Sequence, residues 1–143
     1  MQQNPTRDLQ LDFNINEIKE KIDAVIKAST GSYQKLDKND ILNTYRIATV
    51  SGLLSGIMSI TLKRIDDNKT EWKSEIMNAV GSNAASAVLA RFQDEFLTIL
   101  SKALAGEEIN SELINKNKSG CLGVVLFLLA LGGAVSYSIH SSL

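Results

Sequence analysis

The sequence predicts an all-α protein, in which a small bundle of three or four helices is followed by a single C-terminal transmembrane helix. Three observations lead to this prediction. Apolar residues recur at helical spacing in several segments, polar turn residues separate these segments, and no charged residue follows Lys118. The only proline is Pro5, so the rest of the chain lacks that helix breaker.

The chain divides into five expected parts. A flexible N-terminal lead-in, a helical bundle domain, a polar linker, a transmembrane anchor and a short tail follow one another. Their expected bounds are residues 1–13, 14–105, 106–119, 120–139 and 140–143. The 143 residues leave room for one domain beside the anchor.

The first helix is expected from Ile15 to about Ser29. Asn14 is a suitable N-cap, and Glu17 three residues later completes a capping-box pattern. Gly31 stands where a C-terminal cap is expected. One apolar stripe at i, i+3, i+4 and i+7 spacing is formed by Ile15, Ile18, Ile22, Val25 and Ile26. This pattern is typical of an amphipathic core helix.

A second, longer helix is expected over residues 38–65. It is uncharged between Arg46 and Lys63, and it contains a GxxxG pair, Gly52 and Gly56. Such small residues let two helix backbones approach closely, so these glycines are candidate helix-association residues. A central helix packed on several sides explains the uncharged stretch. A second membrane-active segment and a homodimer seam are the alternatives.

Two further helical segments are expected after the polar turn at residues 66–69. Trp72 marks the first of them as a core or interface anchor, and Gly81 interrupts the pattern. The second runs from Asn83 to Ala105. Its apolar seam, at alternating spacings of four and three, consists of Ala85, Leu89, Phe92, Phe96, Ile99 and Ala103.

The C-terminal segment has the length and composition of a membrane span. Twenty uncharged residues at about 1.5 Å each reach about 30 Å, the thickness of the hydrocarbon core. The candidate anchor residues are Leu122, Val125, Phe127, Leu129, Leu131 and Val135. A face of small residues suited to helix association contains Ala130, Gly132, Ala134 and Ser138. A buried core helix and a re-entrant hairpin bent at Gly132 are the alternatives.

The lysines around this segment predict a topology. Lys116 and Lys118 precede it and no basic residue follows it. The positive-inside bias therefore places the main N-terminal domain in the cytoplasm, as part of a single-pass membrane protein.

The residues that usually carry chemistry are few. The only histidine, His140, and the only cysteine, Cys121, both lie outside the expected bundle. This excludes a histidine-dependent relay and a multi-cysteine metal site within that domain. Adjacent acidic pairs do not share a helix face, so we expect them to be solvated surface: Asp66/Asp67, Asp94/Glu95 and Glu107/Glu108. We predict no catalytic residue, no metal and no cofactor.

The leading prediction is therefore a non-enzymatic, membrane-tethered (tail-anchored) helical interaction or assembly subunit. Its expected partners are the lipid bilayer and either further copies of itself, as a homo-oligomer, or the subunits of a membrane complex. The formal net charge of −1 gives no basic footprint for nucleic acid, and no small-molecule substrate is evident.

The alternative is a membrane-permeabilising, pore-forming or holin-like oligomer. In it residues 47–62 would enter the bilayer beside the anchor, and the hydroxyls of Ser51, Ser55 and Ser59 would line the pore.

Overall fold

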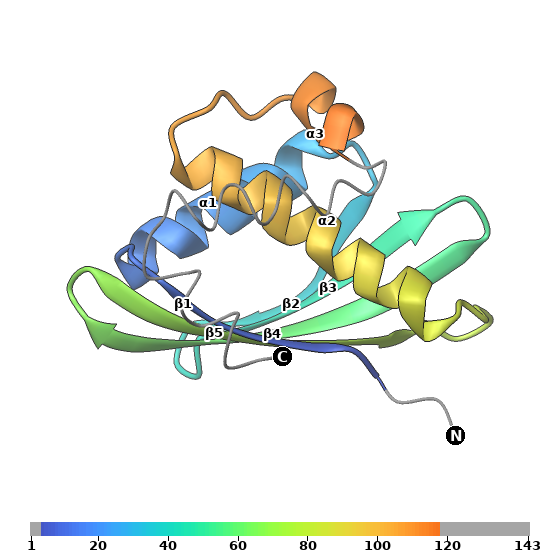
Figure 1. Ribbon diagram of the computed structural model, residues 1–143, viewed down its shortest axis with the longest axis horizontal. Helices are drawn as coiled ribbons and strands as arrows, with labels where there is room; N and C mark the ends of the chain where they lie inside the picture. Colours follow the sequence, from blue (N-terminus) through green and yellow to red (C-terminus); the bar gives the residue numbers. More distant parts are fainter. Residues whose placement is uncertain (1–3, 118–143) are drawn as a thin grey trace.

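The computed structural model describes residues 4–117 of the chain. They form a five-stranded antiparallel sheet with helices on one face (Figure 1). The elements are, in order, β1 (Thr6–Leu11), α1 (Ile15–Ala28), β2 (Tyr33–Asn39), β3 (Thr44–Ser51), β4 (Leu54–Asp66), β5 (Lys69–Asn78), α2 (Ser86–Leu104) and α3 (Ser111–Asn117). The strand order is β1-β5-β4-β3-β2. The first two strands therefore form opposite edges of the sheet, and α1 connects one edge to the other.

The predicted all-α bundle is wrong. The long helix expected over residues 38–65 is instead the end of β2 followed by β3 and β4, and the segment around Trp72 is β5. Side chains on a strand alternate between the two faces, so a buried face appears at every second residue. The buried positions follow this period of two: Tyr45, Ile47 and Thr49 on β3, Met58, Ile60 and Leu62 on β4, and Trp72, Ser74 and Ile76 on β5.

The two glycines of the GxxxG pattern have strand and turn roles. Gly52 has a positive φ of 63° in the turn that joins Ser51 to its cross-strand partner Leu54. Two-residue hairpin turns need such a left-handed residue, and glycine adopts it without strain. Gly56 lies on β4 between Thr49 and Asn78 of the neighbouring strands. Because neither residue is on a helix, the predicted helix-association face does not exist here.

The first predicted helix is confirmed. The Asn14 side chain accepts a hydrogen bond from the Asn16 backbone N–H at 2.8 Å, and α1 begins at Ile15. Its apolar stripe faces the core, where Ile15, Ile18, Ile22 and Val25 are buried. The last predicted helix of the bundle is likewise confirmed as α2, which begins three residues later than expected.

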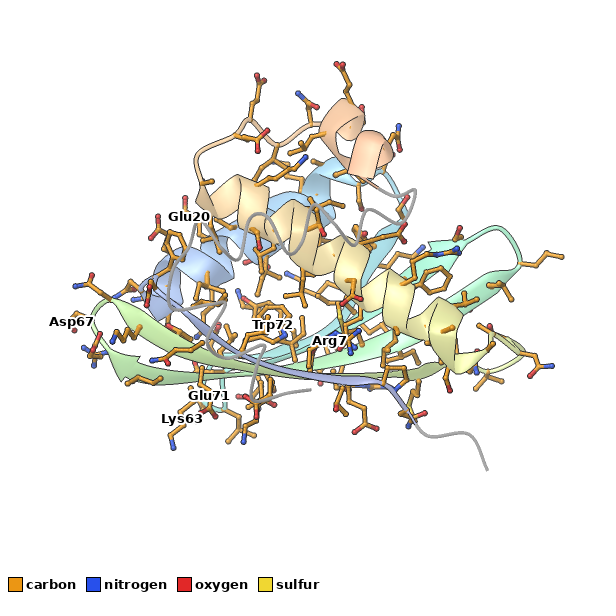
Figure 2. The ribbon with its side chains drawn as sticks, viewed as in Figure 1. Arg7, Glu20, Lys63, Asp67, Glu71 and Trp72 are labelled. Atoms are coloured by element: carbon orange, nitrogen blue, oxygen red, sulfur yellow. The ribbon has the colours of Figure 1, made fainter. Side chains whose placement is uncertain are left out.

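The core fills the layer between the sheet and the helices α1 and α2. Trp72, Tyr45 and Phe96 are its largest side chains, and each is fully buried or nearly so. Figure 2 shows Trp72 pointing from the sheet toward the helices, whereas Lys63 and Glu71 point away from them. The short α3 adds Ile114 to the same core.

The ends of the expected bundle differ from their prediction. Residues 6–11, expected in a flexible lead-in, form the edge strand β1, and residues 111–117 of the expected linker form α3. The predicted anchor at 120–139 and the tail at 140–143 lie outside the described residues.

No helix within residues 4–117 combines the length and the apolar character that crossing a membrane requires. The prediction of a single-pass, tail-anchored helical subunit with a cytoplasmic domain is corrected, because its main domain is a sheet with helices on one face and not a helical bundle. The pore-forming alternative is wrong because residues 47–62 belong to β3 and β4 and not to a helix.

Candidate functional site

Polar side chains buried between α2 and the sheet form the candidate functional site. The interface is mostly apolar, since α2 places Leu89, Phe96 and Ile99 against the sheet with no exposed surface. Polar groups buried in such a layer require hydrogen-bond partners, which makes each of them worth explaining. Those on α2 and the facing strands are Thr49, Thr70, Ser74, Gln93, Glu95 and Thr98.

A small cavity lies where α2 crosses β2 and β3. Its volume is about 10 Å³, close to the room that one water molecule needs. The lining residues are Tyr33, Thr49, Val50, Ser51, Phe92 and Glu95. Three separate elements therefore line one cavity, whose wall is almost entirely apolar.

The local backbone explains why these side chains converge. Tyr33 and Thr49 are direct cross-strand partners on β2 and β3, and both point into the core. Phe92 and Glu95 are three residues apart on α2, so they occupy neighbouring positions on one helix face. The hydroxyl of Thr49 donates to the carbonyl oxygen of Gly56 at 3.5 Å.

The electrostatics of the cavity are set by a carboxyl group in an apolar surrounding. Glu95 is 4% exposed, and Tyr33 beside it is 3% exposed. Burial, and then the negative charge of Glu95, raises the pKa of Tyr33 well above its ordinary value. The phenol is therefore protonated at neutral pH.

A second buried polar chain lies deeper in the same interface. The Trp72 indole N–H donates to the Ser74 hydroxyl at 2.9 Å, and this hydroxyl donates to the Gln93 side-chain oxygen. The Gln93 amide donates in turn to the Pro5 carbonyl at 3.5 Å. These bonds tie β5 and α2 to the residue that precedes β1.

Aromatic rings connect the polar chain with the cavity. The Phe96 ring packs at 6.4 Å from Trp72 and makes an edge-to-face contact with Tyr33 at 5.0 Å between centroids. Edge-to-face pairs of this kind fix ring orientation in addition to burying area. The Phe96 ring therefore stands between the cavity and Trp72, so a change of side-chain packing at the cavity can affect the surroundings of Trp72.

A charged cluster between α1 and the β2–β3 hairpin has a structural role. The Lys38 ammonium lies 3.0 Å from Asp23 and 3.8 Å from Asp40, and it lies 5.4 Å from the centroid of the Tyr45 ring. Lys19 donates to the Asn43 side chain. These contacts fasten the β2–β3 hairpin to α1.

The helix-free face of the sheet carries a shallow hollow of about 370 Å³. Its lining brings together hydroxyls and opposite charges, and Asp8 is the direct cross-strand partner of Lys73. Such alternating charges on an open sheet face are well solvated and stabilise strand pairing. We therefore assign this face to the structure of the sheet and not to the candidate site.

Of the residues predicted from the sequence as sites, the structure describes only Gly52 and Gly56. Gly52 and Gly56 lie on the β3–β4 hairpin, as described above. The predicted anchor residues Leu122, Val125, Phe127, Leu129, Leu131 and Val135, and the small residues Ala130, Gly132, Ala134 and Ser138, lie outside the described residues. The predicted homo-oligomer and the predicted lack of a nucleic-acid partner stay predictions. Among residues 4–117, no three or more His, Cys, Asp and Glu side chains gather as a metal site would require.

The sequence reasoning missed Tyr33, Thr49 and Glu95. It treated Asp94 and Glu95 as solvated surface, but Glu95 is buried and Asp94 is held in an ion pair with Arg7. A signal for Glu95 was present in the sequence. It lies three residues after Phe92 and four before Ile99, both on the apolar seam, so its side chain had to share the buried face of the helix.

The prediction that the chain is not an enzyme is corrected as well. That prediction assumes a helical bundle in which Glu95 is solvated. The domain is instead a sheet with helices on one face, and Glu95 is buried.

Neither a protein-family model nor a curated protein sequence matches this chain. The solved structures that are similar to it include two of low sequence identity. The Zhui aromatase/cyclase from Streptomyces sp. R1128 is 6% identical over 87% of this chain and 92% of that one, with a TM-score of 0.39. CalU16 from Micromonospora echinospora is 9% identical over 86% and 97%, with a TM-score of 0.46. Similarity at this level transfers neither an activity nor a residue to this chain.

Proposed function

We propose that this domain binds a small organic molecule at the cavity between α2 and the β2–β3 hairpin. The observation that carries the proposal is the pairing of a buried carboxyl group, Glu95, with a buried phenol, Tyr33, on one water-sized cavity. A buried titratable group that lines a cavity and has a shifted pKa, as Tyr33 has, marks a candidate binding site.

Fold stability alone is a poor explanation for Glu95. Moving a carboxylate out of water costs several kcal/mol, and an apolar side chain of similar size usually packs at least as stably. Of the buried positions near Glu95 on α2, Phe92, Phe96 and Ile99 are apolar, whereas Gln93 and Thr98 are polar. A carboxyl group buried beside them is a candidate contact for a ligand.

The cavity also has a route to solvent. Ser51, which is exposed at the end of β3, is among the residues that line the cavity. A ligand group placed at the cavity can therefore reach solvent beside Ser51.

The test is a fragment screen that reads out position. Backbone amide signals of isotope-labelled protein are recorded against neutral, cationic and anionic fragments. We expect the binding members to shift the signals of Tyr33, Thr49 and Glu95, and to change the fluorescence of Trp72, the only tryptophan.

Two variants and one control define the site. Glu95→Gln and Tyr33→Phe keep the shape of the cavity and should weaken the binding of every active fragment. Glu20→Gln is the matched control, since it makes the same change at an exposed position of α1 (Figure 2). A screen in which no fragment shifts the cavity residues, or in which all three variants behave alike, would overturn the proposal.

A further inference from the structure

One end of the open face of the sheet is apolar. On this face, which α1 and α2 leave uncovered (Figure 1), Ala48, Ile57 and Met77 form one row of direct cross-strand partners on β3, β4 and β5. None of the three is buried, and Met77 is 45% exposed. Contiguous apolar surface on a folded domain marks an interaction site, whereas scattered apolar side chains are ordinary.

The apolar surface continues to the end of the sheet. Val50 follows on the same face of β3, and Leu53 in the β3–β4 turn and Val80 after β5 are fully exposed. The turn and the segment after β5 are joined, since the Ala79 backbone N–H donates to the Ser55 carbonyl oxygen at 3.1 Å. The apolar end of the open face therefore consists of Ala48, Val50, Leu53, Ile57, Met77 and Val80.

The next row of the sheet carries charges that border this apolar end. Arg46 on β3 and Glu75 on β5 are both direct partners of Ser59 on β4, so they stand on either side of it. Glu75 accepts a hydrogen bond from the Asn4 side chain at 3.0 Å. Although Asp37 on β2 is its direct partner, the Arg46 guanidinium forms no ion pair or hydrogen bond within the described part of the chain.

These two rows are self-complementary under a two-fold rotation. In a symmetric dimer every contact between residue i and residue j of the other copy occurs twice, once in each direction. If two open faces stack about 10 Å apart with the axis along β4, then β3 of each copy faces β5 of the other. Arg46 then meets Glu75 of the second copy, and the small Ala48 meets the large Met77. Ile57 meets its own copy on the axis.

Other arrangements and other partners fit this surface less well. An axis perpendicular to the strands would place Arg46 against Arg46 and Glu75 against Glu75, and such like-charge contacts are costly. A nucleic acid or an anionic lipid surface requires a basic patch, whereas Glu75 and Asp37 balance Arg46 on this row. Lys63, two rows further along β4, would meet its own copy, so the contact ends before it.

We propose that the apolar end of the open face is a homodimer interface. In it β3, β4 and β5 of two copies stack face to face, and each Arg46 pairs with Glu75 of the other copy. The inference does not depend on the proposed ligand site, which lies on the helix-covered face of the sheet. Because the rows span only three strands, we expect a weak dimer whose population rises with concentration.

The experiment exchanges the two charges between chains. Arg46→Glu gives a chain with two acidic groups on the row and Glu75→Arg gives one with two basic groups, so neither should dimerise alone. An equimolar mixture restores opposite charges at both contacts and should associate. Sedimentation velocity of the full chain at increasing concentration measures the association. Amide shifts of Ala48, Ile57 and Met77 in one labelled chain show whether the second chain reaches this face.

We expect each single variant to weaken dimerisation by about tenfold or more, and the mixture to recover most of the loss. Lys27→Glu and Glu20→Arg are the matched control, since they make the same changes of net charge at exposed positions of α1. Alone or mixed, they should associate as the unchanged chain does. Ile57→Thr should weaken the dimer without changing any charge. A melting curve for each variant confirms that it folds.

Several results would overturn the proposal. One is a full chain that stays monomeric at every concentration. Another is association that leaves the amides of Ala48, Ile57 and Met77 unshifted, because the contact then lies elsewhere. Single charge variants that dimerise as the unchanged chain does, or a control mixture that associates as strongly as the test mixture, would also exclude the Arg46–Glu75 contact. If a charge variant does not fold, dilution of the unchanged chain and of Ile57→Thr still decides.

Discussion

Arg7 of β1 and Asp94 of α2 form a bidentate ion pair, in which Nε lies 2.8 Å from Oδ1 and Nη2 lies 2.9 Å from Oδ2. The pair joins the first strand to α2 across most of the described chain. The adjacent Gln93 adds a contact to Pro5. Together they hold α2 against β1, and the next residue, Glu95, lines the same cavity as Tyr33.

The Arg7–Asp94 pair should contribute measurably to stability. Arg7→Gln removes two charge-assisted hydrogen bonds to a carboxylate that is mostly buried, and we expect it to lower the free energy of unfolding by about 1–2 kcal/mol. Arg64→Gln is the matched control, since the Arg64–Asp67 pair joins exposed side chains. Its effect should stay below about 0.5 kcal/mol. Urea denaturation followed by Trp72 fluorescence measures both, and equal losses would contradict the assignment.

Gly56 should tolerate no larger residue, for a reason of space. A Cβ at this position would lie 3.1 Å from two atoms of Ile76 and 3.1 Å from Leu89. We expect Gly56→Ala to cost about 1–3 kcal/mol through overpacking. Adding Ile76→Val, which shortens the crowding side chain, should recover part of this loss.

Gly52 offers the contrast. A Cβ there meets nothing within 4 Å, but the residue has a positive φ of 63°. Gly52→Ala should therefore cost about 1 kcal/mol through backbone strain, and Ile76→Val should not relieve it. Melting curves of the four single and double variants test both statements. Equal rescue of the two alanine variants would show that crowding at Ile76 is not the cause.

Ser74 should be needed for the polar chain beneath α2. Ser74→Ala leaves the Trp72 indole N–H and the Gln93 oxygen without their shared hydroxyl, inside a layer where water cannot replace it. We expect a loss of about 1–3 kcal/mol. Ser59→Ala, at an exposed position on the opposite face of the sheet, should change stability by less than about 0.5 kcal/mol. Chemical denaturation compares them, and a small loss at Ser74 would remove the chain from the list of stabilising contacts.

Stability should fall in alkaline solution because of Tyr45. Burial, and then the negative charge of Asp23, raises the pKa of Tyr45 from 10.0 to about 12. Between these values the unfolded chain has lost the phenolic proton while the folded chain keeps it. The unfolded state then binds fewer protons, so the free energy of unfolding decreases as the pH rises through this window.

The pKa of Lys38 is also raised, chiefly by its hydrogen bond to Asp23, and it acts in the same direction. Tyr45→Phe should therefore lessen the decrease between pH 10 and pH 12 without abolishing it. Urea titrations at a series of pH values measure the slope. A Tyr45→Phe variant as sensitive as the parent chain would exclude Tyr45 as a contributor.

The two main helices could be predicted from the sequence because their information is local. The stripe of Ile15, Ile18, Ile22 and Val25 repeats at the helical period, and Asn14 supplies the cap within the same few residues. The apolar seam from Leu89 to Ile99 repeats at the helical period as well, and it predicted α2. Backbone geometry alone converts such spacing into one apolar face.

The strands were missed because their alternation is incomplete. The buried face includes the polar residues Thr49 and Ser74, while the open face includes the apolar residues Val50 and Ile57. Glycines and serines spaced four apart in the same stretch then matched a helix better than a strand. Pairing with neighbouring strands, which supplies the hydrogen bonds of β3 and β4, is a contact between distant residues.

The sequence by itself determined α1, the core face of α2 and the scarcity of histidine and cysteine. Only the tertiary structure decided that β1 and β2 form opposite edges, and that Tyr33 and Glu95 share a cavity. The physical reason is that periodicity reports which side of an element is buried, but not which element covers it. A buried carboxyl group acquires a partner from the packing of α2 across β2 and β3, and that packing is set by contacts far apart in the chain.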